Sequence, residues 1–251
     1  MSALRWISLR TFWRDRLFVC AATLSVGLAL AAAVTSISLN AIMGNGSALV
    51  PDPARVVIGY RPFLNSPDGA LSDTFPARIR EPLERVTAFE AVTYELNTTD
   101  LSGDWQPIVR LGADLTPASV RVVASDYFRT LGVAVRGPGF AFDDEPDGRP
   151  AAVIVSQRFW RTTLRADRSI VGDVLPTNRT PIVIVGVVES AFEGLRAGDR
   201  TDLWLTFGGH WQFSDLTPRP IIVGIMPLLM VGRLATPDDR SAAEAQAQAI
   251  T

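Results

Sequence analysis

The chain contains 251 residues, of which 47% are hydrophobic, so it can bury a sizeable core in one or two domains. Its formal net charge of −2 gives no positive field to attract phosphates, which argues against a nucleic-acid partner. All 24 basic residues are arginine, so the chain has no P-loop or Schiff-base lysine and is not a Walker-type ATPase by itself.

The first predicted element is a membrane-spanning helix at residues 17–43. No charged residue occurs from Leu17 to Pro51, and roughly 20 helical residues suffice to cross a hydrocarbon core of about 30 Å. The single cysteine, Cys20, lies in this run, so neither a disulfide framework nor a cysteine metal site can form. An excess of arginine before the run predicts a cytoplasmic N-terminal segment, residues 1–16, and an extracytoplasmic remainder. These arginines are Arg5, Arg10, Arg14 and Arg16.

Two other interpretations of this run compete with a membrane anchor. A cleaved signal peptide could use the small residues Ala29, Ala31 and Ala33, but its apolar core is normally about 7–15 residues long. A buried helix of a soluble protein rarely continues this far without a polar face. The length of the run therefore favours the anchor.

Turn-forming residues follow the predicted span. Gly44 and Gly46 tolerate left-handed backbone angles and Pro51-Asp52-Pro53 favours an extended chain, so residues 44–54 are a predicted linker. The folded domain is expected at residues 55–251, and it begins with a short β-branched strand at 55–60.

Mixed strands and short helices are predicted in the rest of the domain, which gives the α+β fold class. A helix is expected from about Phe75-Pro76, capped by Ser72 or Asp73 and weakened by Pro82. The other predicted strands are residues 91–96, 106–111, 119–124, 151–155, 181–188 and 228–234. The other predicted helices are 127–131, stopped by Gly132, and a helix capped at Ser156 that runs to Leu164.

A last helix is predicted from Thr236, with Thr236 as its cap and Pro237 at its first position. It has no stop signal before Thr251, so we expect the domain to be truncated at its C-terminal end. Its apolar face is expected to be Ala242, Ala245, Ala249 and Ile250, without a later element to cover it, so the helix should fray.

Each candidate for chemistry has a simpler structural explanation. The acidic run from Asp143 to Gly148 resembles the start of a calcium loop, but Ile154 stands where the bidentate glutamate belongs, so a solvated turn is expected. His210 has no second histidine or cysteine as a metal partner and is expected in a loop. Ser125 and Ser156 are explained as helix caps. The aromatic residues expected in the core are Tyr127, Phe128, Phe159 and Trp160. We therefore predict no catalytic, cofactor-binding or metal-binding residues and no enzymatic activity.

Several short motifs, in their order along the chain, resemble the MacB-like periplasmic core domain. Residues 123–133, V-A-S-D-Y-F-R-T-L-G-V, are similar to the family signature V-S-x-x-Y-F-x-x-L-G-V. Other similar segments are residues 139–140 with Asp143 and Asp144, 152–156, 159–160, 170–172, Asn178, 184–188, 192–194, 202–205 and 231–234. The chain departs from the family at Leu164-Arg165, where Phe-Gly is frequent, at Asn178-Arg179, where Asn-Gly is common, and at residues 136–139.

This resemblance implies an ABC-type permease of the FtsX/MacB type, anchored in the bacterial inner membrane with a periplasmic domain. Such permeases continue with three further helices, which are absent from this sequence. The resemblance also implies contact with the lipid bilayer, a separate ABC ATPase subunit, a homodimer and a periplasmic or outer-membrane partner. The domain would couple ATP hydrolysis to export or mechanotransmission. The alternative is a signal-anchored extracytoplasmic binding or interaction module without transport activity.

Overall fold

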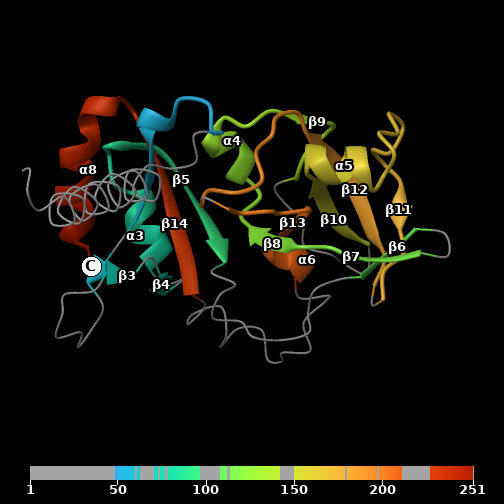
Figure 1. Cartoon of the computed structure of the whole chain (residues 1–251). Helices are drawn as coiled ribbons and strands as arrows, with labels where there is room; N and C mark the ends of the chain where they lie inside the picture. The colour runs from blue at the N-terminus through green and yellow to red at the C-terminus, as the bar shows by residue number, and fades with distance from the viewer. Residues whose placement is uncertain are drawn as a thin grey trace, which may run out of the picture. The chain divides into compact units, whose positions relative to one another are not determined.

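The structure is a computed structural model (Figure 1). It describes residues 49–59, 61–62, 71–72, 74–76, 79–96, 108–111, 114–141, 150–178, 180–196, 198–210 and 227–250. The chain divides into two units after Gly44, and every described residue belongs to the second unit. The predicted segments 1–16 and 17–43 lie outside the described residues. Within the ranges given above, no helix combines the length and apolar character that a membrane crossing requires.

The domain is a mixture of strands and short helices, which confirms the predicted α+β class for this part of the chain. In chain order the elements are η1 (Pro53–Arg55), β1 (Val56–Ile58), β2 (Arg61–Pro62), β3 (Leu71–Ser72), β4 (Thr74–Pro76), α3 (Arg80–Glu84), β5 (Phe89–Leu96), β6 (Ile108–Leu111), β7 (Asp114–Pro117), β8 (Val120–Val123), α4 (Tyr127–Leu131), β9 (Val135–Arg136), β10 (Ala151–Val155), α5 (Gln157–Thr162), β11 (Val174–Leu175), β12 (Ile182–Val188), β13 (Leu203–Thr206), α6 (Phe207–His210), β14 (Pro227–Leu234), η4 (Pro237–Asp239) and α8 (Arg240–Gln248).

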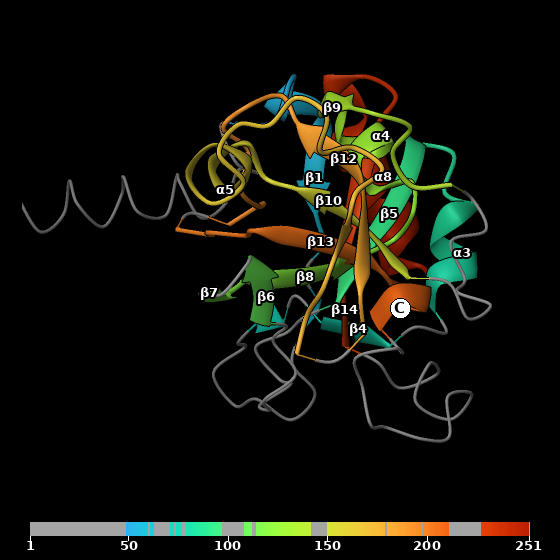
Figure 2. The ribbon, with the colours of Figure 1, turned by 90° about the vertical axis from the view of Figure 1, so that its right-hand side faces the viewer.

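One ten-stranded mixed sheet organises these elements. Its main order is β1-β14-β5-β8-β13-β10-β12-β11, with β4 beside β14 and β9 beside β12. The pairs β8–β13 and β10–β12 are parallel, and the remaining pairs of this sheet are antiparallel. Two further pairs, β2–β3 and β6–β7, form separate two-stranded sheets. Figure 2 shows the same sheet from the end that carries β11 and α5.

The large sheet has two parts. β14 pairs with β5 from Leu228 to Leu234, and together with β1 and β4 they form the first part. The second part contains β8, β13, β10, β12, β11 and β9. The two parts are joined where β5 meets β8, and that contact consists of a single register pair, Glu95 with Val123.

Alternation along the strands divides the core between the two sheet faces. Trp204 of β13 and Val231 of β14 belong to one apolar cluster, which therefore runs across both parts on the face that carries α4. Leu203 and Leu205, the sequence neighbours of Trp204, belong to a second cluster with α5. Met230 belongs to a third cluster, which α3 and α8 cover. Both parts of the sheet are therefore packed on both faces.

Several helix boundaries follow the predicted capping residues. The Ser156 hydroxyl accepts a hydrogen bond from the Phe159 N–H at 3.1 Å and caps α5. Gly132 ends α4 in the left-handed conformation, with φ of 71°. Thr236 and Asp239 form a reciprocal capping box at the start of η4.

The predicted helix near Phe75 is wrong. Residues 74–76 form β4, in which Phe75 pairs with Leu228 of β14 and is only 3% exposed. Helix α3 starts later, at Arg80, and Pro82 lies in its first turn, where the missing N–H costs no helical hydrogen bond. Pairing with β14 therefore overrides the local helical pattern.

The C-terminal helix is docked, contrary to the expectation that it has nothing to pack against. Ala243 is 2% exposed, and Ala247 and Ile250 pack against the third cluster. The residues predicted as the apolar face, Ala242, Ala245 and Ala249, are instead exposed. The Gln246 side chain accepts a hydrogen bond from the Thr87 N–H at 3.1 Å, which fixes the helix against the start of β5.

Candidate functional site: a buried charge network at the sheet junction

The junction between the two parts of the sheet has few backbone contacts. Besides the register pair of Glu95 and Val123, the Ala124 N–H donates to the Tyr94 carbonyl at 2.9 Å. Because so few backbone contacts join β5 to β8, side-chain contacts must fix the angle between the two parts of the sheet.

Glu95 is the centre of the side-chain contacts at this junction. It is 1% exposed, and its carboxylate pairs with Arg121 of β8 and accepts a hydrogen bond from the Tyr127 hydroxyl at 2.8 Å. Burial, followed by the nearby Glu95 charge, raises the pKa of Tyr127 well above its ordinary value, so the phenol stays protonated and donates. One carboxylate thus joins β5, β8 and α4.

Arg121 continues the network into the segment before β13. Its guanidinium pairs with Asp199 and donates to the Thr201 hydroxyl at 3.1 Å. Burial lowers the pKa of Arg121, but Glu95 and Asp199 outweigh burial and the net shift is upward. The cation is therefore permanent and is shared between the two carboxylates.

The turn that holds Asp199 is closely packed. Its carboxylate accepts a hydrogen bond from the Arg196 N–H at 2.8 Å. Gly194 has a φ of 141°, and a Cβ atom there would lie 2.4 Å from Asp199 Oδ2. Only glycine fits this approach, so the backbone itself positions the second carboxylate of the network.

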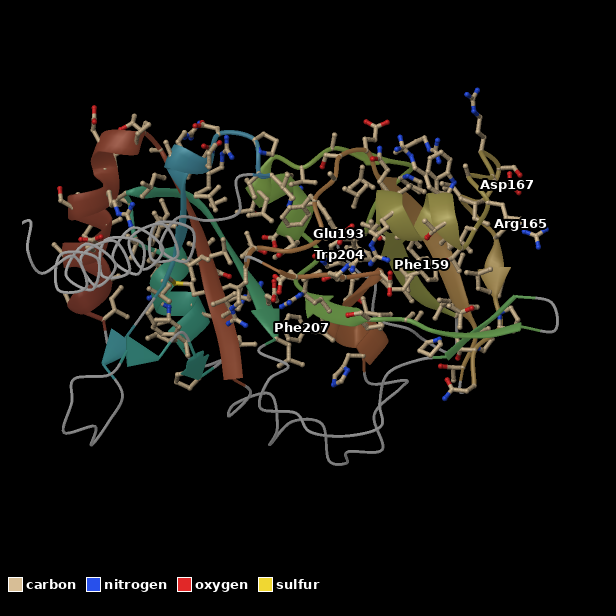
Figure 3. The ribbon with its side chains drawn as sticks, viewed as in Figure 1. Phe159, Arg165, Asp167, Glu193, Trp204 and Phe207 are labelled. Atoms are coloured by element: carbon tan, nitrogen blue, oxygen red, sulfur yellow. The ribbon has the colours of Figure 1, made fainter. Side chains whose placement is uncertain are left out.

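A second ion group ties α5 to the same region. Arg158 pairs with Glu193 at 2.9 Å and with Asp202 at 2.8 Å. The other oxygen of Asp202 accepts a hydrogen bond from the Ser119 N–H at 2.9 Å, directly before β8. Figure 3 shows Glu193 and Trp204 near the middle of the domain, between α4 and α5.

Aromatic rings fill the space on the α4 face beside the network. Phe192 stacks on Trp204 with ring centroids 5.9 Å apart. Phe128 of α4 meets Trp204 edge to face at 5.3 Å and Tyr127 edge to face at 5.5 Å. These rigid contacts hold Tyr127, and thus its bond to Glu95, in one position.

A separate ionic cluster, the N-terminal clamp, fixes the start of the domain. It consists of Asp52, Arg55, Glu90 and Arg233. Arg55 pairs with Glu90 and donates from Nε to the Leu234 carbonyl at 2.8 Å, and Arg233 lies 3.5 Å from Glu90. The first described turn of the domain is therefore tied to the end of β14.

The predicted site residues have structural roles where they are described. Asp126, not Ser125, is the N-cap residue of α4, and its carboxylate accepts from the Thr93 hydroxyl at 2.7 Å instead of capping the helix. The acidic run at 143–148 lies outside the described residues. Across the described segments, no three His, Cys, Asp or Glu side chains are grouped as metal ligands.

His210 differs from the expectation of a loop residue. It ends α6 and is 2% exposed, and burial lowers its pKa to about 4. The Thr206 hydroxyl accepts a hydrogen bond from the Gly209 N–H at 3.1 Å, as a helix cap does, which explains a helical turn over two glycines.

Glu95 and Arg121 are the residues that sequence reasoning missed. Each is a single charged residue inside an otherwise uncharged strand segment, Thr93–Leu96 or Val120–Val123. Two opposite charges in such positions are a signal for a buried pair. Their separation by 26 residues hid the contact, because no local spacing rule connects them.

Comparison with known proteins gives a family profile and a set of similar folds. The chain matches the profile of the MacB-like periplasmic core domain over residues 17–250. The periplasmic region of MacB from Actinobacillus actinomycetemcomitans is similar at 13% identity with a TM-score of 0.53, over 78% of this chain and 81% of that chain. A domain of a protein described as a permease from Porphyromonas gingivalis is similar at 12% identity with a TM-score of 0.51, over 80% and 85%.

A further similar structure is the extracellular domain of the ABC-type transporter YknZ from Gram-positive bacteria. It is 15% identical, with a TM-score of 0.49, over 76% of this chain and 88% of that chain. No curated protein matches the chain significantly. At these identities the structural likenesses show the fold alone.

Proposed function

The chain belongs to the family of MacB-like periplasmic core domains, and from this membership we propose that it is a membrane-anchored permease component, or the N-terminal part of one, in an ABC-type transporter. Residues 17–43 cross the bacterial inner membrane once, with the N-terminus in the cytoplasm and the domain in the periplasm. The observation that carries the proposal is the family match over residues 17–250, which includes the long apolar run.

A separate ABC-type ATPase supplies the energy in this proposal, since the chain has no lysine for a phosphate loop. The periplasmic domain passes the resulting motion to an exported substrate, or to a periplasmic or outer-membrane partner. A homodimer would place two such domains side by side. The chain's own part in this process is mechanical and requires no catalytic residue.

Two structural features support a mechanical role. The N-terminal clamp ties the segment that follows the predicted span to the end of β14, so displacement of that segment would pull on the sheet. The network of Glu95 and Arg121 then fixes the angle between the two parts of the sheet. A lever of this kind needs a rigid body with a defined joint.

The test begins with topology and ends with the partner. We expect a periplasmic reporter such as alkaline phosphatase to be active when fused after Thr251, and a cytoplasmic fluorescent reporter at the same position to be dark. The tagged full chain, purified from membranes of its own host in mild detergent, should retain an ABC-type ATPase that can be trapped with ATP and vanadate.

The matched control replaces residues 1–43 with an unrelated single span of the same orientation, which should remove the ATPase and leave the domain in place. Reversed reporter activities would contradict the topology. A chain with the expected topology that retains periplasmic proteins but no ATPase would support the alternative, a signal-anchored binding or interaction module.

A further inference from the structure

Some of the described arginines pair with carboxylates and others do not. Those at the clamp, at the junction and on α3 and α8 all pair with carboxylates. Arg161, Arg165 and Arg168, at the end of α5 and in the loop that follows, are exposed, and none has a carboxylate within 4.0 Å among the described residues. The nearby Asp167 carboxylate accepts hydrogen bonds from the N–H and hydroxyl of Ser169 instead, at 2.9 and 2.8 Å.

The backbone holds one of these arginines, Arg165, in an unusual conformation. Arg165 and Ala166 both have a φ of 55°, the left-handed region that favours glycine. The Ala166 N–H donates to the Trp160 carbonyl at 2.9 Å, which holds the loop in place. A long cationic side chain thus occupies a position where the local backbone favours the smallest residue, and Figure 3 shows Arg165 directed outward from the domain.

Trp160 anchors the loop that carries Arg165 and Arg168. Its indole N–H donates to the Asp167 carbonyl at 2.6 Å, and the Arg136 guanidinium lies over its ring, 4.4 Å from the centroid. Nε and Nη2 of Arg136 have no hydrogen-bond partner among the described residues. Tryptophan, tyrosine and arginine are the side chains enriched at the energetic centres of protein interfaces.

We propose that this face, formed by Arg161, Arg165 and Arg168 at the end of α5 and in the loop that Trp160 anchors, binds an acidic segment of a partner protein. Guanidinium groups pair with carboxylates in a planar, two-pronged geometry, so three unbalanced arginines select a chain that carries several carboxylates. The inference is independent of the transport role.

A lipid surface fits this face less well than a protein does. Membrane-bound faces insert apolar side chains between their cations, whereas the exposed side chains here, from Arg161 to Ser169, include no large apolar group. The face also lies toward the end of the domain that carries β11, and α8 and η1 lie toward the other end (Figure 1).

The test uses the full chain in phosphatidylcholine nanodiscs and a fluorescein-labelled octaglutamate peptide, with binding followed by anisotropy at low ionic strength. The triple variant R161Q/R165Q/R168Q should bind about tenfold more weakly, because three exposed ion pairs are lost. The matched control R80Q/R85Q/R240Q removes the same charge from exposed arginines on α3 and α8 and should change affinity by less than about twofold.

The single variant Arg165→Gly separates binding from folding, because its backbone favours glycine. It should weaken peptide binding and keep the fold. Equal loss of binding in the two triple variants would overturn the proposal, because net charge alone would then explain the affinity. Arginine-dependent binding to phosphatidylglycerol vesicles without peptide binding, or full displacement of the peptide by inorganic phosphate, would also overturn it.

Discussion

Replacing Arg121 with methionine removes the cation that balances Glu95 at the sheet junction. Methionine retains much of the side-chain volume, so the main change is electrostatic. Glu95 is 1% exposed and keeps only the Tyr127 hydroxyl as a donor among the contacts described above. Leaving a buried charge without its partner costs about 3–5 kcal/mol, a large share of the roughly 5–15 kcal/mol that stabilises a typical domain.

The assay is urea unfolding of the full chain in detergent micelles, followed by tryptophan fluorescence. With a denaturant slope of about 2 kcal/mol/M, the midpoint should fall by about 2 M. The control is Arg85→Met, because the Arg85–Glu81 pair is 74% exposed on both sides and should contribute less than about 0.5 kcal/mol. The double variant Glu95→Gln/Arg121→Met should recover much of the lost stability, since it no longer buries an unbalanced charge. If Arg121→Met is as mild as the control, the junction is not held by a buried charge pair.

Three further changes test local features of the domain. Gly194→Ala should lower the free energy of unfolding in urea by about 2 kcal/mol or more, because the new Cβ would collide with Asp199. The control Gly139→Ala has open space around its Cβ and should lower it by only about 1 kcal/mol. Arg165→Gly should stabilise by about 1 kcal/mol by relieving a left-handed backbone, and a lowered melting temperature would contradict this. Because burial lowers the pKa of His210 to about 4, the neutral form is favoured in the folded state, so stability should fall by up to about 3 kcal/mol as the pH drops from 6.5 to 4. This loss should be absent in His210→Gln, and an equal loss in that variant would show that other groups cause it.

The sequence predicts well the strands and helix ends that depend on residues close to them in the chain. Residues 151–155 and 182–188 are short apolar runs rich in β-branched side chains, and both are strands. Ser156 and Thr236 cap helices through contacts three residues away, which the sequence displays directly. Residues that depend on neighbours nearby in sequence were therefore predictable.

The elements that the sequence does not predict depend on distant partners. Leu203–Thr206 is buried on both faces and so lacks the alternation that marks a strand, although it lies at the centre of the sheet between β8 and β10. Phe75 is a strand residue only because β14 lies beside it. The candidate site also depends on distant partners. Arg121 pairs with Glu95, 26 residues before it, and with Asp199, 78 residues after it.

The composition of the junction bears on how a motion could pass through it. Apolar packing on the α4 face does not fix one orientation of the two parts, because the free energy of burying apolar surface depends on the buried area and not on the contact angle. The bonds that Glu95 of β5 makes with Arg121 of β8 and Tyr127 of α4 are directional, and a rotation about the β5–β8 contact would strain both together. A buried ion pair contributes little net stability compared with an apolar replacement, so the role we propose for this pair is to fix the angle between the parts. It follows that a well-packed neutral replacement could be as stable as the native chain and still transmit motion poorly. Such a variant would separate the proposed role of the network in coupling from its role in folding.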